Sequence, residues 1–209
     1  PYIIEMAPDK KVQTIPVYFF NGQKNEVPGF DERKDILFVG YFGHPPNPDA
    51  ILWFVNEVFP IVRQNIPDVN LHVVGSHPTN EVKNLQCDSI HVTGYVSDEK
   101  LAWFYNSCRV AVLPLRFGAG VKGKLLETLN YGLPPVITSI AAEGVIDIEK
   151  NTLIADKPND FAKMVGTLYS DKAKWKNYQR LGRKLINAHY TENAARNLLE
   201  GIFGESIQY

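Results

Sequence analysis

The chain has 209 residues, with 22 basic and 23 acidic side chains and a formal net charge of −1. This length suits one domain, or one domain with a helical tail, and the balanced charge without a long basic run argues against a nucleic-acid-binding protein. No apolar run approaches the length of a transmembrane helix. Two cysteines, Cys87 and Cys108, give neither a disulfide framework nor a metal site, and their apolar neighbours predict two small core residues.

The N-terminal segment, residues 1–35, holds one apolar stretch from Ile15 to Phe20 and then a turn-rich segment that begins at Asn21-Gly22. This pattern predicts a linker or an accessory strand. No signal peptide opens the chain, and Pro1 stands in place of an initiator methionine. We therefore expect a cytoplasmic protein and a sequence that is part of a longer one.

Between residues 36 and 158, short apolar runs alternate with amphipathic segments. The apolar runs predict strands at residues 36–40, 71–75, 90–94, 109–114, 135–138 and 152–155, the last one short and near an edge. Continuous apolar strands that alternate with helices are typical of a parallel sheet covered on both faces. We predict an α/β, doubly wound, Rossmann-like core over residues 36–158, followed by C-terminal helices over residues 159–209 that pack on or leave the core.

The first predicted helix carries two local signals. Asn47 is expected to cap its N-terminus, with Pro48 at the first helical position. Pro60 lies inside the same apolar periodicity, and an internal proline predicts a kink because it removes a backbone donor.

The most informative stretch follows the fourth predicted strand, where residues 118–127 read GAGVKGKLLE. A strand, a glycine-rich loop, a helix N-terminus and a lysine together form a place to hold phosphate. The loop amides and the helix dipole direct positive charge to one point, and glycine lets the backbone approach an anion closely. We therefore predict a phosphorylated ligand, with a nucleotide as the first choice.

Two familiar phosphate motifs fit this loop poorly. Gly118, Gly120 and Gly123 match G-x-G-x-x-G, but the dinucleotide motif belongs in the first strand–helix unit and needs an acidic residue at the end of the next strand. That strand ends at Thr138-Ser139, and Glu143 lies beyond it.

A P-loop is also nearly matched by Gly118, Gly123 and Lys124. However, Leu125 stands where a serine or threonine should hold magnesium, which makes an NTPase a poor candidate.

The helix that follows the loop has two different faces. Lys124, Glu127 and Tyr131 share one face, whereas three leucines that would pack on the sheet, Leu125, Leu126 and Leu129, share the other. This arrangement turns the lysine and the glutamate towards the ligand crevice at the strand ends. An ordinary exposed ion pair with the same spacing, worth a few tenths of a kcal/mol, is the competing interpretation.

Residues 118–127, with residues 131–138 (YGLPPVIT), resemble the C-terminal domain of retaining glycosyltransferases of the GT-B fold, glycosyl transferases group 1, family 4. Residues 38–47 (FVGYFGHPPN), 94–99 (GYVSDE) and 141–144 (AAEG) are similar to further landmarks of that family. The resemblance covers most of the chain, from about residue 36 to its end.

The resemblance implies a site for a nucleotide sugar. It implies that Glu127 holds the donor ribose, that Lys124 contacts the diphosphate and that both take part in catalysis, with no metal and no further cofactor. The turns at Gly75 and at Tyr95-Val96 would line the base pocket. The whole expected site comprises Gly43, His44, Gly75, Tyr95, Val96, Gly118, Ala119, Gly120, Val121, Lys122, Lys124, Leu125 and Glu127.

Some positions depart from the family pattern. Much of the family has a second glutamate where this chain has Ala119, and basic residues where it has Tyr41 and Pro46. Neutralisation of the diphosphate should therefore fall on Lys122 and Lys124, with Arg116 a weaker candidate.

The expected function is the donor-binding half of an enzyme that moves a sugar from a nucleoside diphosphate to an acceptor glycan or lipid-linked sugar. An N-terminal domain would supply the acceptor wall, and peripheral association of the full-length enzyme with the inner face of the membrane stays open. The alternatives are a non-catalytic nucleotide-sugar-binding module, for which Ala119 is the hint, and a GT-B nucleotide-sugar epimerase.

Overall fold

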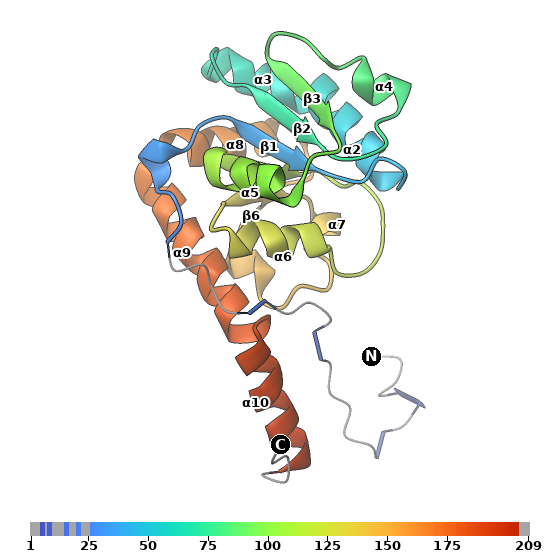
Figure 1. Ribbon diagram of the computed structural model, residues 1–209, viewed down its shortest axis with the longest axis vertical. Coiled ribbons are helices and arrows are strands. Elements are labelled where there is room, and N and C mark those ends of the chain that lie inside the picture. The colour runs from blue at the N-terminus through green and yellow to red at the C-terminus, as the bar shows by residue number, and fades with distance from the viewer. Residues whose placement is uncertain (1–4, 7, 10–14, 17–19, 22–25, 205–209) are drawn as a thin grey trace.

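The computed structural model describes residues 26–204 together with 5–6, 8–9, 15–16 and 20–21 (Figure 1). Its centre is a six-stranded, all-parallel sheet in the order β3-β2-β1-β4-β5-β6. The strands are β1 (Ile36–Val39), β2 (Leu71–Val74), β3 (Ile90–Gly94), β4 (Val110–Leu113), β5 (Pro135–Ile137) and β6 (Leu153–Ile154). The predicted doubly wound α/β fold is confirmed, and each predicted strand is present within the described residues.

Helices cover both faces of this sheet. Helices α5 (Asp98–Ser107) and α6 (Gly123–Asn130) lie in front of it in Figure 1, whereas α3 (Phe59–Asn65) and α8 (Pro158–Ser170) pack together behind it. Because both faces are covered, the central strands are buried, and all four residues of β4 are inaccessible. Continuous apolar runs in the sequence are the direct consequence.

The first crossover begins differently from the prediction. Helix α2 (Pro46–Trp53) starts at Pro46 with Pro45 at the N-cap, so Asn47 lies inside the first turn and is only 7% exposed. The prediction of Asn47 as the cap is therefore wrong. Two consecutive prolines already have a backbone angle close to that of a helix, so the helix can begin before the asparagine.

Pro60 does not interrupt the helical run but follows a wide turn. Residues Phe54–Val58 form a π-helical segment in which the Phe59 amide donates to the Phe54 carbonyl, five residues back. Pro60 then falls in the first turn of α3, where a missing backbone donor is tolerated. A π-helical segment therefore lies between α2 and α3, where the sequence predicts a kink, and such segments are themselves sites of helix bending.

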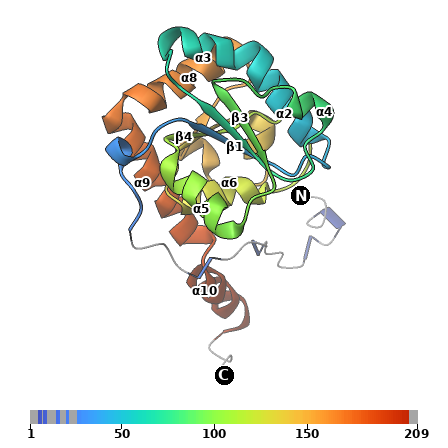
Figure 2. The same cartoon turned by 45° about the horizontal axis from the view of Figure 1, so that its top comes forward.

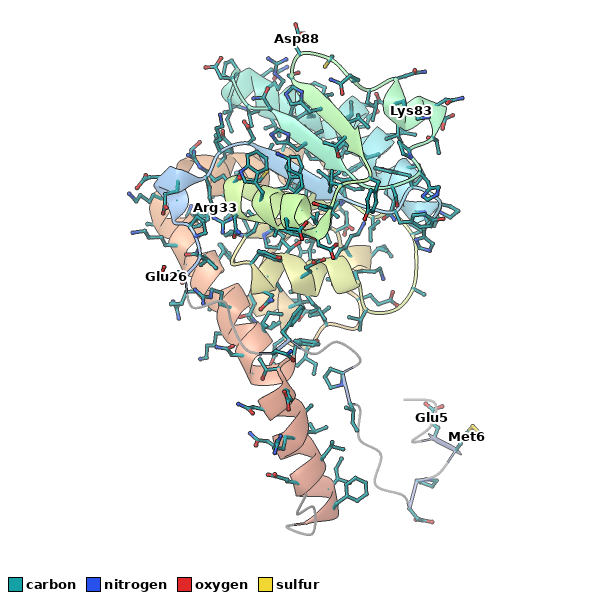
Figure 3. All side chains as sticks on the ribbon, viewed as in Figure 1. Glu5, Met6, Glu26, Arg33, Lys83 and Asp88 are labelled. Carbon is teal, nitrogen blue, oxygen red and sulfur yellow. The ribbon has the colours of Figure 1, made fainter. Side chains whose placement is uncertain are left out.

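Residues 26–35 pack against the sheet domain through Arg33, which follows the short 3-10 helix η1 (Phe30–Glu32) and is 1% exposed (Figure 3). Its guanidinium donates to the carbonyls of Pro28 (2.9 Å), Tyr105 (2.5 Å), Cys108 (3.1 Å) and Tyr131 (2.9 Å). Burial lowers the pKa of Arg33 to about 10. One buried arginine therefore ties this segment to the C-terminal ends of α5 and α6.

The described residues from Pro158 to Phe203 are largely helical, as the sequence pattern predicts, and residues 205–209 lie outside the described residues. Helix α8 is followed by α9 (Lys172–His189), which packs on α6, and by α10 (Glu192–Phe203), which extends away from the body of the molecule (Figures 1 and 2). Of the predicted stretch from Ile15 to Phe20, residues 17–19 lie outside the described residues. Phe20 forms a parallel bridge with Thr191, just before α10.

The remaining short elements are α4 (Asn80–Lys83), α7 (Ser139–Ala142) and the 3-10 helix η3 (Ile148–Lys150).

Cys108 is buried, whereas Cys87 is exposed, so the prediction of two core cysteines is wrong for Cys87. It lies in the turn that leads into β3, where it pairs with Ile90 across an isolated bridge and its Sγ lies 3.6 Å from Ser89 Oγ. None of the described helices is both long enough and apolar enough to cross a bilayer.

Candidate nucleotide site

The strand order reverses between β1 and β4, and the candidate site lies at this reversal. The chain leaves β1 towards β2 on one side and leaves β4 towards β5 on the other, although β1 and β4 pair directly through Ile36–Val110 and Leu37–Ala111. The loops after the two strands therefore diverge, and open α/β sheets bind ligands in the crevice that this leaves. The two loops are residues 40–45 and residues 114–122, which contain the segments singled out in the sequence.

Lys124 joins the two sides of this crevice. It stands in the first turn of α6, and its Nζ donates to the Val39 carbonyl (3.2 Å) and to Asn47 Oδ1 (2.6 Å). The ammonium also lies 5.0 Å from the centre of the Phe38 ring. Lys124 is therefore a partly buried residue at the end of β1, and the interpretation as a solvated surface lysine does not fit it.

The surroundings of Lys124 disfavour its charged form. Burial, with a smaller contribution from the neighbouring Lys122, lowers the pKa of Lys124 to about 7. The groups that accept its hydrogen bonds are a carbonyl and a side-chain amide, both neutral. An anion bound in the crevice would supply the negative charge that these partners do not.

Glu127 lies one turn further along α6 and faces α5. Tyr105, which is fully buried, donates its hydroxyl to Glu127 Oε2 at 3.2 Å. Burial first, and then the nearby Glu127 charge, raise the pKa of Tyr105 well above its usual range. The Tyr105 ring also stacks on Tyr131 with 4.7 Å between the ring centres. Glu127 is thus oriented by a rigid aromatic pair.

A hollow of about 270 Å³ opens beside Lys124 at the ends of β1, β2 and β3. Its lining includes three residues expected at the base pocket, Gly75, Tyr95 and Val96, together with Lys124. Tyr41, Asn47 and Asp98 are among the lining residues that were not expected from the sequence. The sequence signal for Asn47 pointed to a helix cap, and only the preceding pair of prolines could have indicated that it turns inward.

The backbone at position 75, at the end of β2, can only accommodate a glycine. Its φ is +155°, and a Cβ at this position would lie 1.7 Å from the Gly40 carbonyl oxygen. Any side chain would therefore push β1 and β2 apart at the mouth of the hollow. The glycine thus permits the close approach of the two backbones at the edge of the hollow.

The glycine-rich loop lies exposed between β4 and α6. Gly118 and Gly120 have φ angles of +125° and +75°, which side-chain-bearing residues rarely adopt. Lys122, at the N-cap of α6, folds back so that its amine donates to the Gly120 carbonyl, and it lies 3.8 Å from Glu143. The lysine therefore holds the loop in its turn.

The other expected site residues occupy varied surroundings. Gly43 and His44 are exposed in the loop after β1, and Ala119 and Val121 are exposed in the glycine-rich loop. The Leu125 side chain is fully buried in the core, and its amide donates to the Lys122 carbonyl at 2.8 Å. Arg116 forms a bidentate ion pair with Asp49 of α2, which ties the glycine-rich loop to the first crossover.

A larger hollow of about 570 Å³ lies elsewhere, along the edge strand β6 and helices α8 and α9. Its lining mixes lysines and aspartates, among them Asp156, Asp160, Lys163 and Lys174. It has neither a glycine-rich loop nor a place at the reversal of strand order, so the smaller hollow beside Lys124 is the better candidate for a nucleotide.

Comparison with known proteins agrees with this geometry. The family described as glycosyl transferases group 1 matches residues 33–171, more than half of the chain. The chain belongs to the glycosyl transferases group 1 family. A curated relative is an uncharacterized 44.6 kDa protein in the cps region of Klebsiella pneumoniae, 31% identical over 117 residues, which are 53% of this chain and 30% of the relative.

Solved structures of similar fold include two larger proteins. A TarM mutant from S. aureus in complex with Fondaparinux, alpha-GlcNAc-glycerol and UDP has a TM-score of 0.72 at 14% identity and covers 98% of this chain. The pneumococcal O-GlcNAc transferase GtfA in complex with UDP and GlcNAc has a TM-score of 0.69 at 16% identity and covers 92%. The matches cover 42% and 39% of those two chains, so this chain spans well under half the length of these two structural relatives.

Proposed function

We propose that this chain is the donor-binding half of a glycosyltransferase and that it binds a nucleoside-diphosphate sugar in the crevice between β1 and β4. The observation that carries the proposal is Lys124, which lies at the reversal of strand order with neutral hydrogen-bond partners. It stands at a helix N-terminus after a glycine-rich loop, a combination suited to a diphosphate. Membership of the glycosyl transferases group 1 family supports the same ligand, as does the UDP bound in both similar structures.

The chemistry of transfer needs stabilisation of the departing diphosphate. The Gly123 and Lys124 amides precede the Leu125 amide, which donates to the Lys122 carbonyl, and together with the Lys124 ammonium they can receive the charge that develops on the leaving oxygen. We propose that the site works without a metal. Fixed backbone amides and a lysine ammonium can stabilise a departing diphosphate by themselves.

The nucleoside would lie along the hollow towards β3. We propose that Glu127, held by the Tyr105 hydroxyl, accepts hydrogen bonds from the ribose hydroxyls. The base would then reach the part of the hollow lined by Gly75, Tyr95 and Val96. The acceptor, a glycan or a lipid-linked sugar, would be held by parts of the full-length enzyme outside this chain.

We also propose a cytoplasmic location, because both cysteines are free thiols. Peripheral contact of the full-length enzyme with the inner face of the membrane would follow if its acceptor is lipid-linked.

Calorimetry with a panel of UDP-, GDP- and ADP-sugars tests the proposal. One member of the panel should bind with or without EDTA, and Lys124→Ala should weaken its binding roughly ten- to a hundredfold, as for a charge-assisted contact. Lys83→Ala is the matched control, because Lys83 is exposed on α4 and does not line the hollow beside Lys124. Equal losses in the two variants, or binding that requires magnesium, would contradict the site described.

A further inference from the structure

Asn47 is a polar side chain of the hollow to which the proposed function gives no role. It lies in the first turn of α2 and is 7% exposed, and both the nitrogen and the oxygen of its side-chain amide form hydrogen bonds. Nδ2 donates to the Tyr41 carbonyl at 2.8 Å, and Oδ1 accepts from Lys124 Nζ at 2.6 Å. The side chain therefore links the loop after β1 to the start of α6.

These contacts fix the orientation of the amide. The Tyr41 carbonyl can only accept a hydrogen bond, so the NH₂ group must face it and the oxygen must face Lys124. A lysine ammonium has three N–H donors. Within the part of the chain that the structure describes, Asn47 and the Val39 carbonyl take two of them, which leaves one for a ligand oxygen.

An amide holds the ammonium without cancelling its charge, which a carboxylate would do. The titratable groups around Lys124 are Lys122 at the N-cap of α6, Glu127 within α6, Tyr41 after β1 and Asp98 at the start of α5. Of these, Lys122 acts on the Lys124 charge, and it opposes protonation. The charge at this point is therefore available to an anion in the crevice.

We propose that Asn47 is a positioning residue of the diphosphate site, which holds the charged Lys124 amine against the end of β1 with one N–H left for a diphosphate oxygen. This inference rests on the proposed function. It gives α2, which belongs to the connection between β1 and β2, a part in building the site. The recognisable sequence motif of that site lies in the connection after β4.

A double-mutant cycle tests the coupling between the two residues. The variants are Asn47→Ala, Lys124→Met and the pair together, with calorimetric affinity for the best-binding nucleoside diphosphate, UDP, GDP or ADP, as the measurement. Asn47→Ala should lower the affinity about tenfold in the wild-type background and have no further effect beside Lys124→Met. Asn56→Ala is the control, because Asn56 is exposed on the same helical run and should leave the affinity unchanged.

A second measurement reads the lysine itself and needs no nucleotide. Carbon-13 NMR of the lysine side chains gives the titration midpoint of Lys124 in each variant, with Lys124→Met assigning the signal. A hydrogen-bond acceptor favours the charged amine, so Asn47→Ala should lower the midpoint, whereas the carboxylate of Asn47→Asp should raise it. Asn47→Asp should nevertheless bind nucleotide more weakly than wild type, because its charge cancels that of the lysine.

Different results bear on the positioning role of Asn47 and on nucleotide binding by the chain. Independent, additive losses in the cycle, or a Lys124 midpoint that does not move in either Asn47 variant, would overturn the positioning role. Absence of nucleotide binding by the wild-type protein would overturn the proposed function, while shifted midpoints would still show that Asn47 acts on Lys124. If Asn47→Ala does not fold, Asn47→Ser replaces it with the same expectation, because its side chain is too short to reach the amine.

Discussion

Two charged residues three positions apart on α6 have opposite surroundings. Lys124 bonds to neutral oxygens at the end of β1, whereas Glu127 accepts from a buried tyrosine of α5. Both side chains are partly buried and held by other elements. They therefore differ from an exposed ion pair, whose members point into water and contribute little to stability.

Glu127 can be tested by its effect on binding. Glu127→Ala should weaken nucleoside diphosphate binding about tenfold or more while the protein stays folded, because the ribose loses a charged acceptor. Glu127→Gln should weaken it less, since the amide retains an acceptor oxygen. Calorimetry and thermal melting are the measurements, with the exposed Glu57→Ala as control. Unchanged affinity in Glu127→Ala would favour a purely structural role.

The depressed pKa of Lys124 makes folding stability depend on pH. Burial lowers this pKa from the ordinary value of 10.5 to about 7. Between these values the unfolded chain holds a proton that the folded chain lacks, so this group makes the folded state more stable as pH rises from about 7 to 10.5. Lys124→Met removes the titration. Its stability relative to wild type should be highest below about pH 7 and should decline towards pH 10.

Urea unfolding of wild type and Lys124→Met at several pH values gives this difference, because effects of other titrating groups cancel between the two proteins. A difference that stays constant from about pH 6 to about pH 10 would mean that the lysine is not desolvated in the folded state.

At the scale of elements, the sheet could be predicted because its strands are buried on both faces. That burial produces unbroken apolar runs such as the one ending at Val39, which differ plainly from helical periodicity. The π-helical segment before Pro60 and the early start of α2 at Pro46 could not be predicted from the sequence. Both depend on how prolines fit into a helix that packs on the sheet.

The site was predictable to a lesser extent. The loop from Gly118 and the basic and acidic residues after it are local in sequence, so their motif can be recognised. The contact of Lys124 with Asn47 joins residues 77 positions apart, and no local pattern encodes it. Arg33 was assigned to a linker segment for the same reason, since its acceptors lie on α5 and α6, far along the chain.

Arg33 should therefore dominate the docking of residues 26–35. Arg33→Met keeps the apolar stem but leaves buried carbonyls at the ends of α5 and α6 without a donor, so we expect a loss of about 3 kcal/mol in the free energy of unfolding. Urea unfolding measures it, and Arg63→Met is the control, since Arg63 is exposed. Losses of similar size in both variants would argue against a special role for the buried arginine.

At the scale of the whole molecule, the described residues form the donor side of the proposed enzyme. The chain matches 42% and 39% of the two larger structures, and α10 extends beyond the sheet domain with its apolar residues only partly covered (Figure 2). The hollow at the ends of β1, β2 and β3 is lined by residues suited to a nucleotide and its diphosphate, and we expect the acceptor sugar to be held by the rest of the proposed enzyme.

Donor binding and sugar transfer should accordingly need different lengths of the protein. The 209-residue chain should bind a nucleoside-diphosphate sugar yet give no transfer product with a mixture of donors and candidate acceptors, whereas the full-length protein should form a new glycosidic product. Mass spectrometry of the reaction mixtures distinguishes the alternatives, because an epimerase would return an isomeric nucleotide sugar and a non-catalytic module would return its ligand unchanged. Lys124→Ala in the full-length enzyme should lower turnover more than it lowers binding, since part of its contribution arises only as the diphosphate departs. Robust transfer by the 209-residue chain alone would show that the acceptor is held by residues described here, and the division of labour proposed for the two halves would be wrong.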